Sequence, residues 1–123
     1  MGRFTGRFAW GASKSERDAH DADLSYLMAW GSSHTGVEGF VEPANKFNDL
    51  TIVLVDIDGN WTRRALSGPK AAQRLGRELE MPVYDVLKVG YPKRMRDKLE
   101  RARILRKRAA REELLRDMPR SEG

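Results

Sequence analysis

The segment from Pro92 to Met118 concentrates the positive charge of the chain, and this is the most informative feature of the sequence. Its pattern predicts one long helix, with eleven of the 23 basic residues of the chain and five acidic ones. Eleven bases less five acids give this segment a net charge of +6, and because the whole chain carries +5, the remainder sums to −1. Such a helix on a nearly neutral body indicates a binding surface for a polyanion, or a solvated helix whose apolar stripe is covered by the body.

The charges and apolar residues of this helix can be placed on its circumference. From Arg101 to Arg111 there are six bases and no acid. Met95, Leu99 and Ala102 recur near one line at helical spacing, which predicts a narrow apolar stripe. We therefore predict a polyanion ligand, with nucleic acid, either DNA or RNA, as the first choice. The candidate contact residues are Lys93, Arg94, Arg96, Arg101, Arg103, Arg106, Lys107, Arg108 and Arg111.

Two further features bear on this binding function. Neither a helix-turn-helix pair nor a zinc finger is visible in the sequence, so we expect binding that does not depend on base sequence. Ion pairs such as Glu100 with Arg103 are also typical of a solvated or protein-binding helix. The alternative is therefore an interaction module whose terminal helix pairs with an acidic protein or with a second copy of the chain, giving a homo-oligomer.

Residues 37–91 hold the apolar runs expected of a folded core. Val37 to Val41 predict a first strand, and Leu50 to Ile57 form a nearly continuous apolar run that is typical of a central, buried strand. Asp58-Gly59 then indicates a tight type I′ hairpin leading to a third strand from Trp61 to Leu66.

Helices and one more strand complete the prediction. A helix capped by Ser67 is expected to end near Glu80, and Val83 to Val89 is expected to form a fourth strand, parallel to the third. An N-terminal helix from about Glu16 to Trp30 is expected to begin with a capping box of Ser15 and Asp18.

These elements predict a single α+β domain with a mixed sheet of about four strands, a hairpin and a βαβ-like crossover. Strand order is left open. The parts are an N-terminal arm and short helix (1–36), the core (37–91) and the basic helix with its tail (92–123).

Asp56 and Asp58 raise a third class of function. An apolar strand that ends in Asp-x-Asp-Gly resembles the first motif of haloacid-dehalogenase-type phosphatases, over Leu50 to Gly59. The resemblance implies that Asp56 attacks phosphorus, that Asp58 acts as acid and base, and that both lie near Mg²⁺. The alternative is that Asp58-Gly59 is only a hairpin turn, which the strand-like sequence after Asn60 favours. We prefer the hairpin, and expect no cofactor.

The setting is indicated by composition and by a second resemblance. Gly59 to Arg64, Pro82 to Val86 and Gly90 to Arg96 resemble small uncharacterised proteins of high-GC Gram-positive bacteria and their mobile elements, which implies a bacterial origin and brings no activity with it. The chain has no cysteine, which excludes disulfides and suits a reducing compartment. No apolar run of signal-peptide or membrane-span length is present. We therefore expect a cytoplasmic protein that does not bind membranes.

Overall fold

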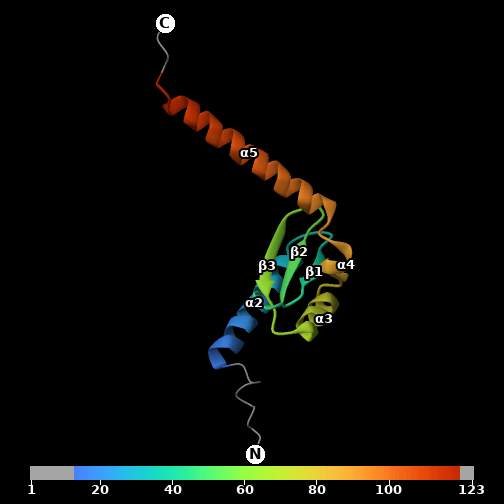
Figure 1. Cartoon of the computed structure of the whole chain (residues 1–123). Helices are drawn as coiled ribbons and strands as arrows, with labels where there is room; N and C mark the ends of the chain where they lie inside the picture. The colour runs from blue at the N-terminus through green and yellow to red at the C-terminus, as the bar shows by residue number, and fades with distance from the viewer. Residues whose placement is uncertain (1–12, 120–123) are drawn as a thin grey trace, which may run out of the picture.

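Three antiparallel strands form the centre of the fold, and a fourth strand joins them in parallel (Figure 1). The computed structural model describes residues 13–119. β1 (Glu38–Glu42) pairs with β2 (Thr51–Val55), and β2 with β3 (Trp61–Ala65), both antiparallel. β4 (Val83–Asp85) pairs in parallel with β1, so the sheet order is β3-β2-β1-β4. The predicted α+β fold with a mixed sheet is confirmed. β4 also runs parallel to β3, as predicted, although two strands separate them.

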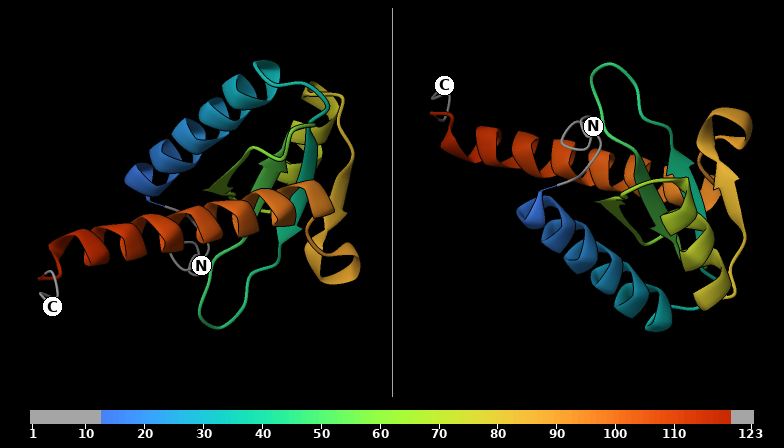
Figure 2. Two further views of the ribbon diagram at one scale, coloured as in Figure 1. Left: turned by 90° about the horizontal axis from the view of Figure 1, so that it is seen from above. Right: turned by 90° about the horizontal axis from the view of Figure 1, so that it is seen from below.

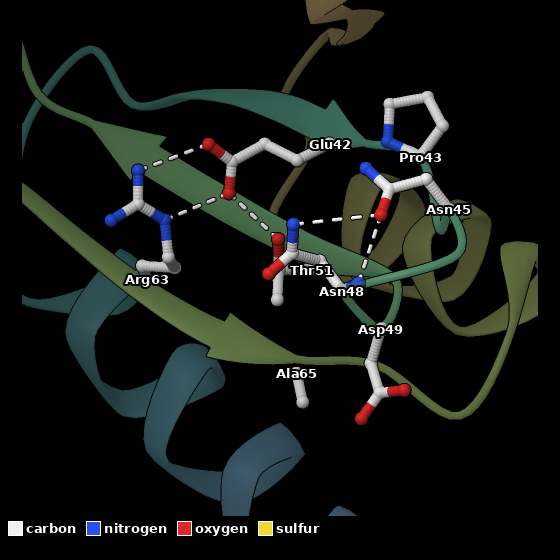
Figure 3. Close-up of a pocket in the computed structure, with 8 residues that line it drawn as sticks. All are labelled: Glu42, Pro43, Asn45, Asn48, Asp49, Thr51, Arg63 and Ala65. Carbon is white, nitrogen blue, oxygen red and sulfur yellow. Dashed lines mark hydrogen bonds and ion pairs between the residues drawn. The ribbon is translucent and has the colours of Figure 1, made fainter.

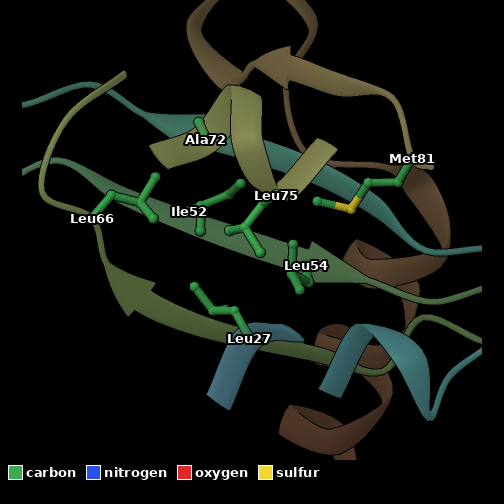
Figure 4. Close-up of a cluster of buried hydrophobic side chains, with 7 residues drawn as sticks. All are labelled: Leu27, Ile52, Leu54, Leu66, Ala72, Leu75 and Met81. Carbon is green, nitrogen blue, oxygen red and sulfur yellow. The ribbon is translucent and has the colours of Figure 1, made fainter. Parts of the chain in front are cut away.

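β2 is buried on both faces of the sheet, as its continuous apolar run predicted. Successive side chains of a strand point to opposite faces. Ile52 and Leu54 face α2 (Lys14–Ser32) and α3 (Pro69–Glu78), where Leu27 and Leu75 pack on them (Figure 4). The other face has its own cluster, made by Phe40, Val53, Val55 and Met95. Met95 belongs to α5 (Lys93–Asp117), so α2 and α5 lie on opposite sides of the sheet (Figure 2).

Two helix starts differ from the sequence prediction. The capping box of α2 is formed by Ser13 and Glu16, and the predicted box of Ser15 and Asp18 is wrong by two positions. Ser13 has the extended backbone that an N-cap requires, which frees its side chain to accept from the Glu16 amide. α3 is preceded by Gly68 as its N-cap, with no side-chain cap, so Ser67 does not have the predicted role.

The predicted fourth strand from Val83 to Val89 is wrong after Asp85. The chain turns there into the short helix α4 (Val86–Val89). The Asp85 carboxylate accepts a hydrogen bond from the Leu87 amide at 2.9 Å, and this cap starts a helical turn. A run of β-branched and apolar residues favoured a strand, but the local cap at Asp85 starts a helical turn instead.

α5 begins against the sheet and then leaves it (Figure 1). Met95 is 2% exposed, whereas no residue from Arg96 to Met118 is buried. At about 1.5 Å per residue, the part of α5 beyond Met95 extends roughly 30 Å from the body. The N-terminal arm of the predicted division, residues 1–12, lies outside the described residues.

Candidate nucleic-acid interface

α5 is attached to the body through its first turn. Met95 fills the space between Phe40, Val53 and Val55 on the second face of the sheet. Gly59, in the β2–β3 hairpin, lies so close to this turn that a Cβ atom on it would stand 2.4 Å from the Arg94 carbonyl oxygen. The hairpin and the helix start therefore fit together only with glycine at this position.

The hairpin is held by Asp56. Its Oδ1 accepts from the backbone amides of Asp58 and Asn60, both at 2.9 Å, and its Oδ2 accepts from Asn60 Nδ2 at 3.0 Å. Gly59 has a φ of +89°, but Asp58 does not have positive φ, since Glu80 is the sole non-glycine residue with positive φ in the described chain. The predicted type I′ turn is therefore wrong. The bonds Gly59 N to Asp56 O and Asp56 N to Asn60 O instead give a three-residue loop closed by a left-handed glycine.

Arg94 connects this hairpin to the sheet. Its Nε donates to the Asp56 carbonyl oxygen at 2.7 Å, and one terminal nitrogen lies 2.6 Å from Glu38 Oε1. These contacts come from the end of β2 and from β1, and they leave the guanidinium only partly exposed. The structure thus places this predicted contact residue in the attachment of α5.

Three other predicted contact residues have partners along the chain. Lys93 Nζ lies 2.7 Å from Asp97 Oδ2, and Arg96 Nε donates to the Tyr91 carbonyl oxygen at 3.1 Å. Arg103 makes an ion pair with Glu100. Hydrogen bonds from Lys93 and Arg103 lower the pKa of Asp97 and Glu100 respectively. All these pairs are exposed, so an incoming phosphate can compete for their cations.

Five predicted contact residues have no ion pair or side-chain hydrogen bond to any described residue. They are all exposed, and they are Arg101, Arg106, Lys107, Arg108 and Arg111. At roughly 100° per residue, the six bases from Arg101 to Arg111 cover about 220° of the helix circumference. The rest of that circumference holds Leu105, Ala109 and Ala102. Basic side chains therefore occupy more than half of the circumference of this part of α5.

The apolar stripe predicted for α5 is covered by the body only at its start. Met95 is buried, but Leu99 is 42% exposed and Leu105 is 56% exposed. The alternative in which the body covers the whole stripe is therefore wrong beyond the first turn. A helix this polar and this little buried draws almost none of its stability from packing.

A second polar group, which the sequence did not reveal, links the α4–α5 connection to the sheet. Glu42 accepts hydrogen bonds from Arg63 at 2.7 and 3.0 Å, from Thr51 at 2.6 Å, and from the Tyr91 hydroxyl. It borders a cavity of about 510 Å³ over the ends of β1 to β3 (Figure 3). Burial raises the pKa of Glu42, but the hydrogen bonds from Arg63, Thr51 and Tyr91 outweigh it and leave that pKa below its usual value.

The phosphatase resemblance can be compared with the geometry of its two carboxylates. Asp56 is 4% exposed, and both its oxygens accept bonds from the hairpin, whereas Asp58 is exposed. His34 Nε2 lies 3.9 Å from Asp56 Oδ2. Within residues 13–119 no three His, Asp or Glu side chains gather as they would around a metal ion. Asp56 thus has the surroundings of a turn cap, as the hairpin interpretation expected.

Comparison of the chain with models of protein families, with curated proteins and with solved structures gave no match. The resemblance to small proteins of high-GC Gram-positive bacteria stays a prediction. In the part of the chain that the structure describes, none of the helices has the length and apolarity needed to cross a membrane.

Proposed function

We propose that this protein binds nucleic acid, without dependence on base sequence, through the cationic surface of α5. The observation that supports the proposal best is the set of five exposed bases, Arg101, Arg106, Lys107, Arg108 and Arg111, which make no ion pair or side-chain hydrogen bond to any described residue. Nucleic acid supplies closely spaced phosphates, and neutralising them releases condensed counterions, which drives association.

The remaining bases add to this surface in different ways. Lys93, Arg96 and Arg103 can exchange exposed intramolecular contacts for phosphates. Arg94 is bound to Glu38 and Asp56 and serves to position the helix. The rest of the chain sums to −1, so the excess positive charge of the chain lies in the helix.

The experiment is a salt titration of binding. Fluorescence anisotropy of a labelled 20-mer duplex and of its single strand is measured between 50 and 200 mM salt. With five phosphate contacts, the slope of log K against log salt should be about −4.5 for the duplex, a loss of several hundredfold over this range. A variant with Arg101, Arg106, Lys107 and Arg108 changed to Gln should lose most of the slope. Absence of binding at 50 mM salt would refute the proposal.

A matched control separates local charge from total charge. Lys70, Arg74 and Arg77 are exposed on α3, which covers the first face of the sheet, opposite the attachment of α5. Changing these three to Gln removes nearly as much charge as the α5 variant. If the control loses as much affinity as the α5 variant, binding is not located on α5.

A second candidate is supported by the exposed apolar residues near the end of α5. Leu114, Leu115 and Met118 are all more than half exposed, which favours contact with an acidic protein or another copy. Two copies would bring two helices of +6 together, so self-pairing requires high salt. Light scattering that shows a multiple of the monomer mass, with no nucleic-acid binding, would favour this candidate.

The proposed setting is the bacterial cytoplasm, where nucleic acid is within reach of such a protein. The absence of cysteine and the resemblance over Gly90 to Arg96 support this setting.

A further inference from the structure

We propose that the ligand of α5 is duplex DNA in the B form, and that the helix lies along its major groove. This inference rests on the proposed function and names the class of nucleic acid. It is carried by the residue types of α5, by the width of its cationic arc, and by its freedom from the body.

The residue types on α5 favour a duplex over an unpaired strand. Proteins that hold single strands combine positive charge with aromatic rings on which bases stack. From Lys93 to Asp117 there is no Phe, Trp, Tyr or His. There is also no Asn or Gln to read adenine edges. The helix therefore offers charge for phosphates and no aromatic ring on which unpaired bases would stack.

The width of the cationic arc favours a groove over a flat surface. A helix that rests on a flat acidic surface uses cations on one side only. In a groove, phosphates stand on both walls, so a helix needs cations on opposite flanks. On α5, Arg103 and Arg106 lie on one flank, and Arg101 and Arg108 lie roughly 140–160° away on the other. Lys107 and Arg111 lie between the flanks and would face the floor of the groove.

The dimensions of α5 suit the B form. An α-helix with its side chains is about 10–12 Å wide, and the major groove of B-DNA is about 12 Å wide. The major groove of A-form RNA is too narrow and deep for side chains to read. Because no residue from Arg96 to Met118 is buried, the body does not block either flank. Figure 1 shows α5 extending clear of the sheet, so a duplex can approach along the helix.

The first test compares ligands at one salt concentration. Dissociation constants of the full chain are measured for a 20-bp DNA duplex, an RNA duplex of the same sequence, and the single-stranded DNA. We expect the DNA duplex to bind at least about tenfold more tightly than the other two. Equal or tighter binding of either competitor would overturn the groove assignment and leave the proposed function standing. Failure of all three to bind would overturn both.

The second test compares the two flanks. Arg103→Gln with Arg106→Gln removes one flank, and Arg101→Gln with Arg108→Gln removes the other. All chains carry Glu100→Gln, so that no variant leaves the partner of Arg103 as an unpaired acid. Each pair should reduce the salt slope for duplex DNA by about 1.8. Arg74→Gln with Arg77→Gln on α3, in the same background, is the control and should leave the slope unchanged.

Three outcomes of this second test are decisive. Similar losses from both flanks, with no change in the control, support the groove. Loss confined to one flank means that α5 rests with one face on the ligand, which overturns the inference but keeps α5 as the binding surface. If the control changes as much as the flank variants, binding is not located on α5 and the proposed function is wrong as well. Circular dichroism shows whether each variant keeps its helix content.

Discussion

Gly59→Ala should destabilise the protein by more than a glycine-to-alanine change in an exposed turn would, because Gly59 is buried. Two separate features of Gly59 produce this expectation. Its φ of +89° lies in the region that L side chains rarely adopt. In addition, its Cβ would stand 2.4 Å from the Arg94 carbonyl oxygen and 2.9 Å from the carbonyl carbon. Backbone atoms cannot rotate away, so the first turn of α5 would have to move.

The two features contribute separately to the free energy of unfolding. Left-handed backbone costs an L-residue about 1–2 kcal/mol. Extra volume in a tightly packed position that forces a backbone shift costs about 1–3 kcal/mol. Together they predict a loss of about 2–5 kcal/mol for Gly59→Ala.

Asparagine at the same position separates these contributions. Asn tolerates the left-handed region, so Gly59→Asn relieves most of the backbone strain while keeping the Cβ. Because the Cβ would still meet the Arg94 carbonyl group, this variant should still lose about 1–3 kcal/mol. Gly68→Ala is the control, because Gly68 has extended backbone and no atom within 4 Å of an added Cβ. It should lose less than about 1 kcal/mol, mainly through its N-cap position.

The assay is urea unfolding followed by circular dichroism. With a slope of about 2 kcal/mol per molar urea, the expected loss for Gly59→Ala moves the midpoint by roughly 1–2.5 M. If Gly59→Asn unfolds at the wild-type midpoint, the loss of stability in Gly59→Ala comes from its backbone φ alone. The reasoning that Gly59 positions α5 would then be refuted.

Three further predictions concern α5 and Asp56. A chain that ends at Asp97 should unfold cooperatively near the wild-type midpoint, because Arg94 and Met95, which attach α5 to the body, remain. It should bind no nucleic acid, because the exposed bases beyond Asp97 are gone. A loss of cooperative unfolding would contradict this prediction. Asp56→Asn should lose about 1–2 kcal/mol at pH 7, because its amide would face the Asn60 Nδ2 donor. Burial raises the pKa of Asp56 but hydrogen bonds from Asn60 and Asp58 bring it below its usual value, so this difference should shrink as the pH falls below about 4. The wild type should show no magnesium-dependent hydrolysis of a phosphomonoester.

The parts of the fold that were predictable are those in which nearby residues carry the signal. The apolar run around Leu54 predicted a strand buried on both faces, and the structure has β2 there with neighbours on either side. The basic helix expected over residues 92–118 agrees with α5. Both depend on periodicity and composition within one element, and the tertiary structure does not override either of them.

The parts that were not predictable depend on contacts between distant residues. Strand order follows from the crossover that brings β4 beside β1, and no local pattern indicates which edge the chain will choose. The bonds of Glu42 to Arg63 and Tyr91 join residues 21 and 49 positions apart. Arg94 looked identical to its cationic neighbours in the sequence, yet it alone reaches Glu38. Arg94 positions α5 because it directly precedes Met95, and the buried Met95 determines which side of the helix meets the body.

The charge pattern of α5 also bears on the energy of the free protein. Four pairs of bases on α5 are like-charged neighbours at helical spacing: Arg103 with Arg106, Arg103 with Lys107, Lys107 with Arg111, and Arg108 with Arg111. Each such pair costs a few tenths of a kcal/mol, so this part of the helix carries about 1–2 kcal/mol of self-repulsion. Packing does not offset this repulsion, because no residue from Arg96 to Met118 is buried. Phosphates placed along both flanks would remove this repulsion and stabilise the helix at the same time, so binding and helix formation in α5 reinforce each other.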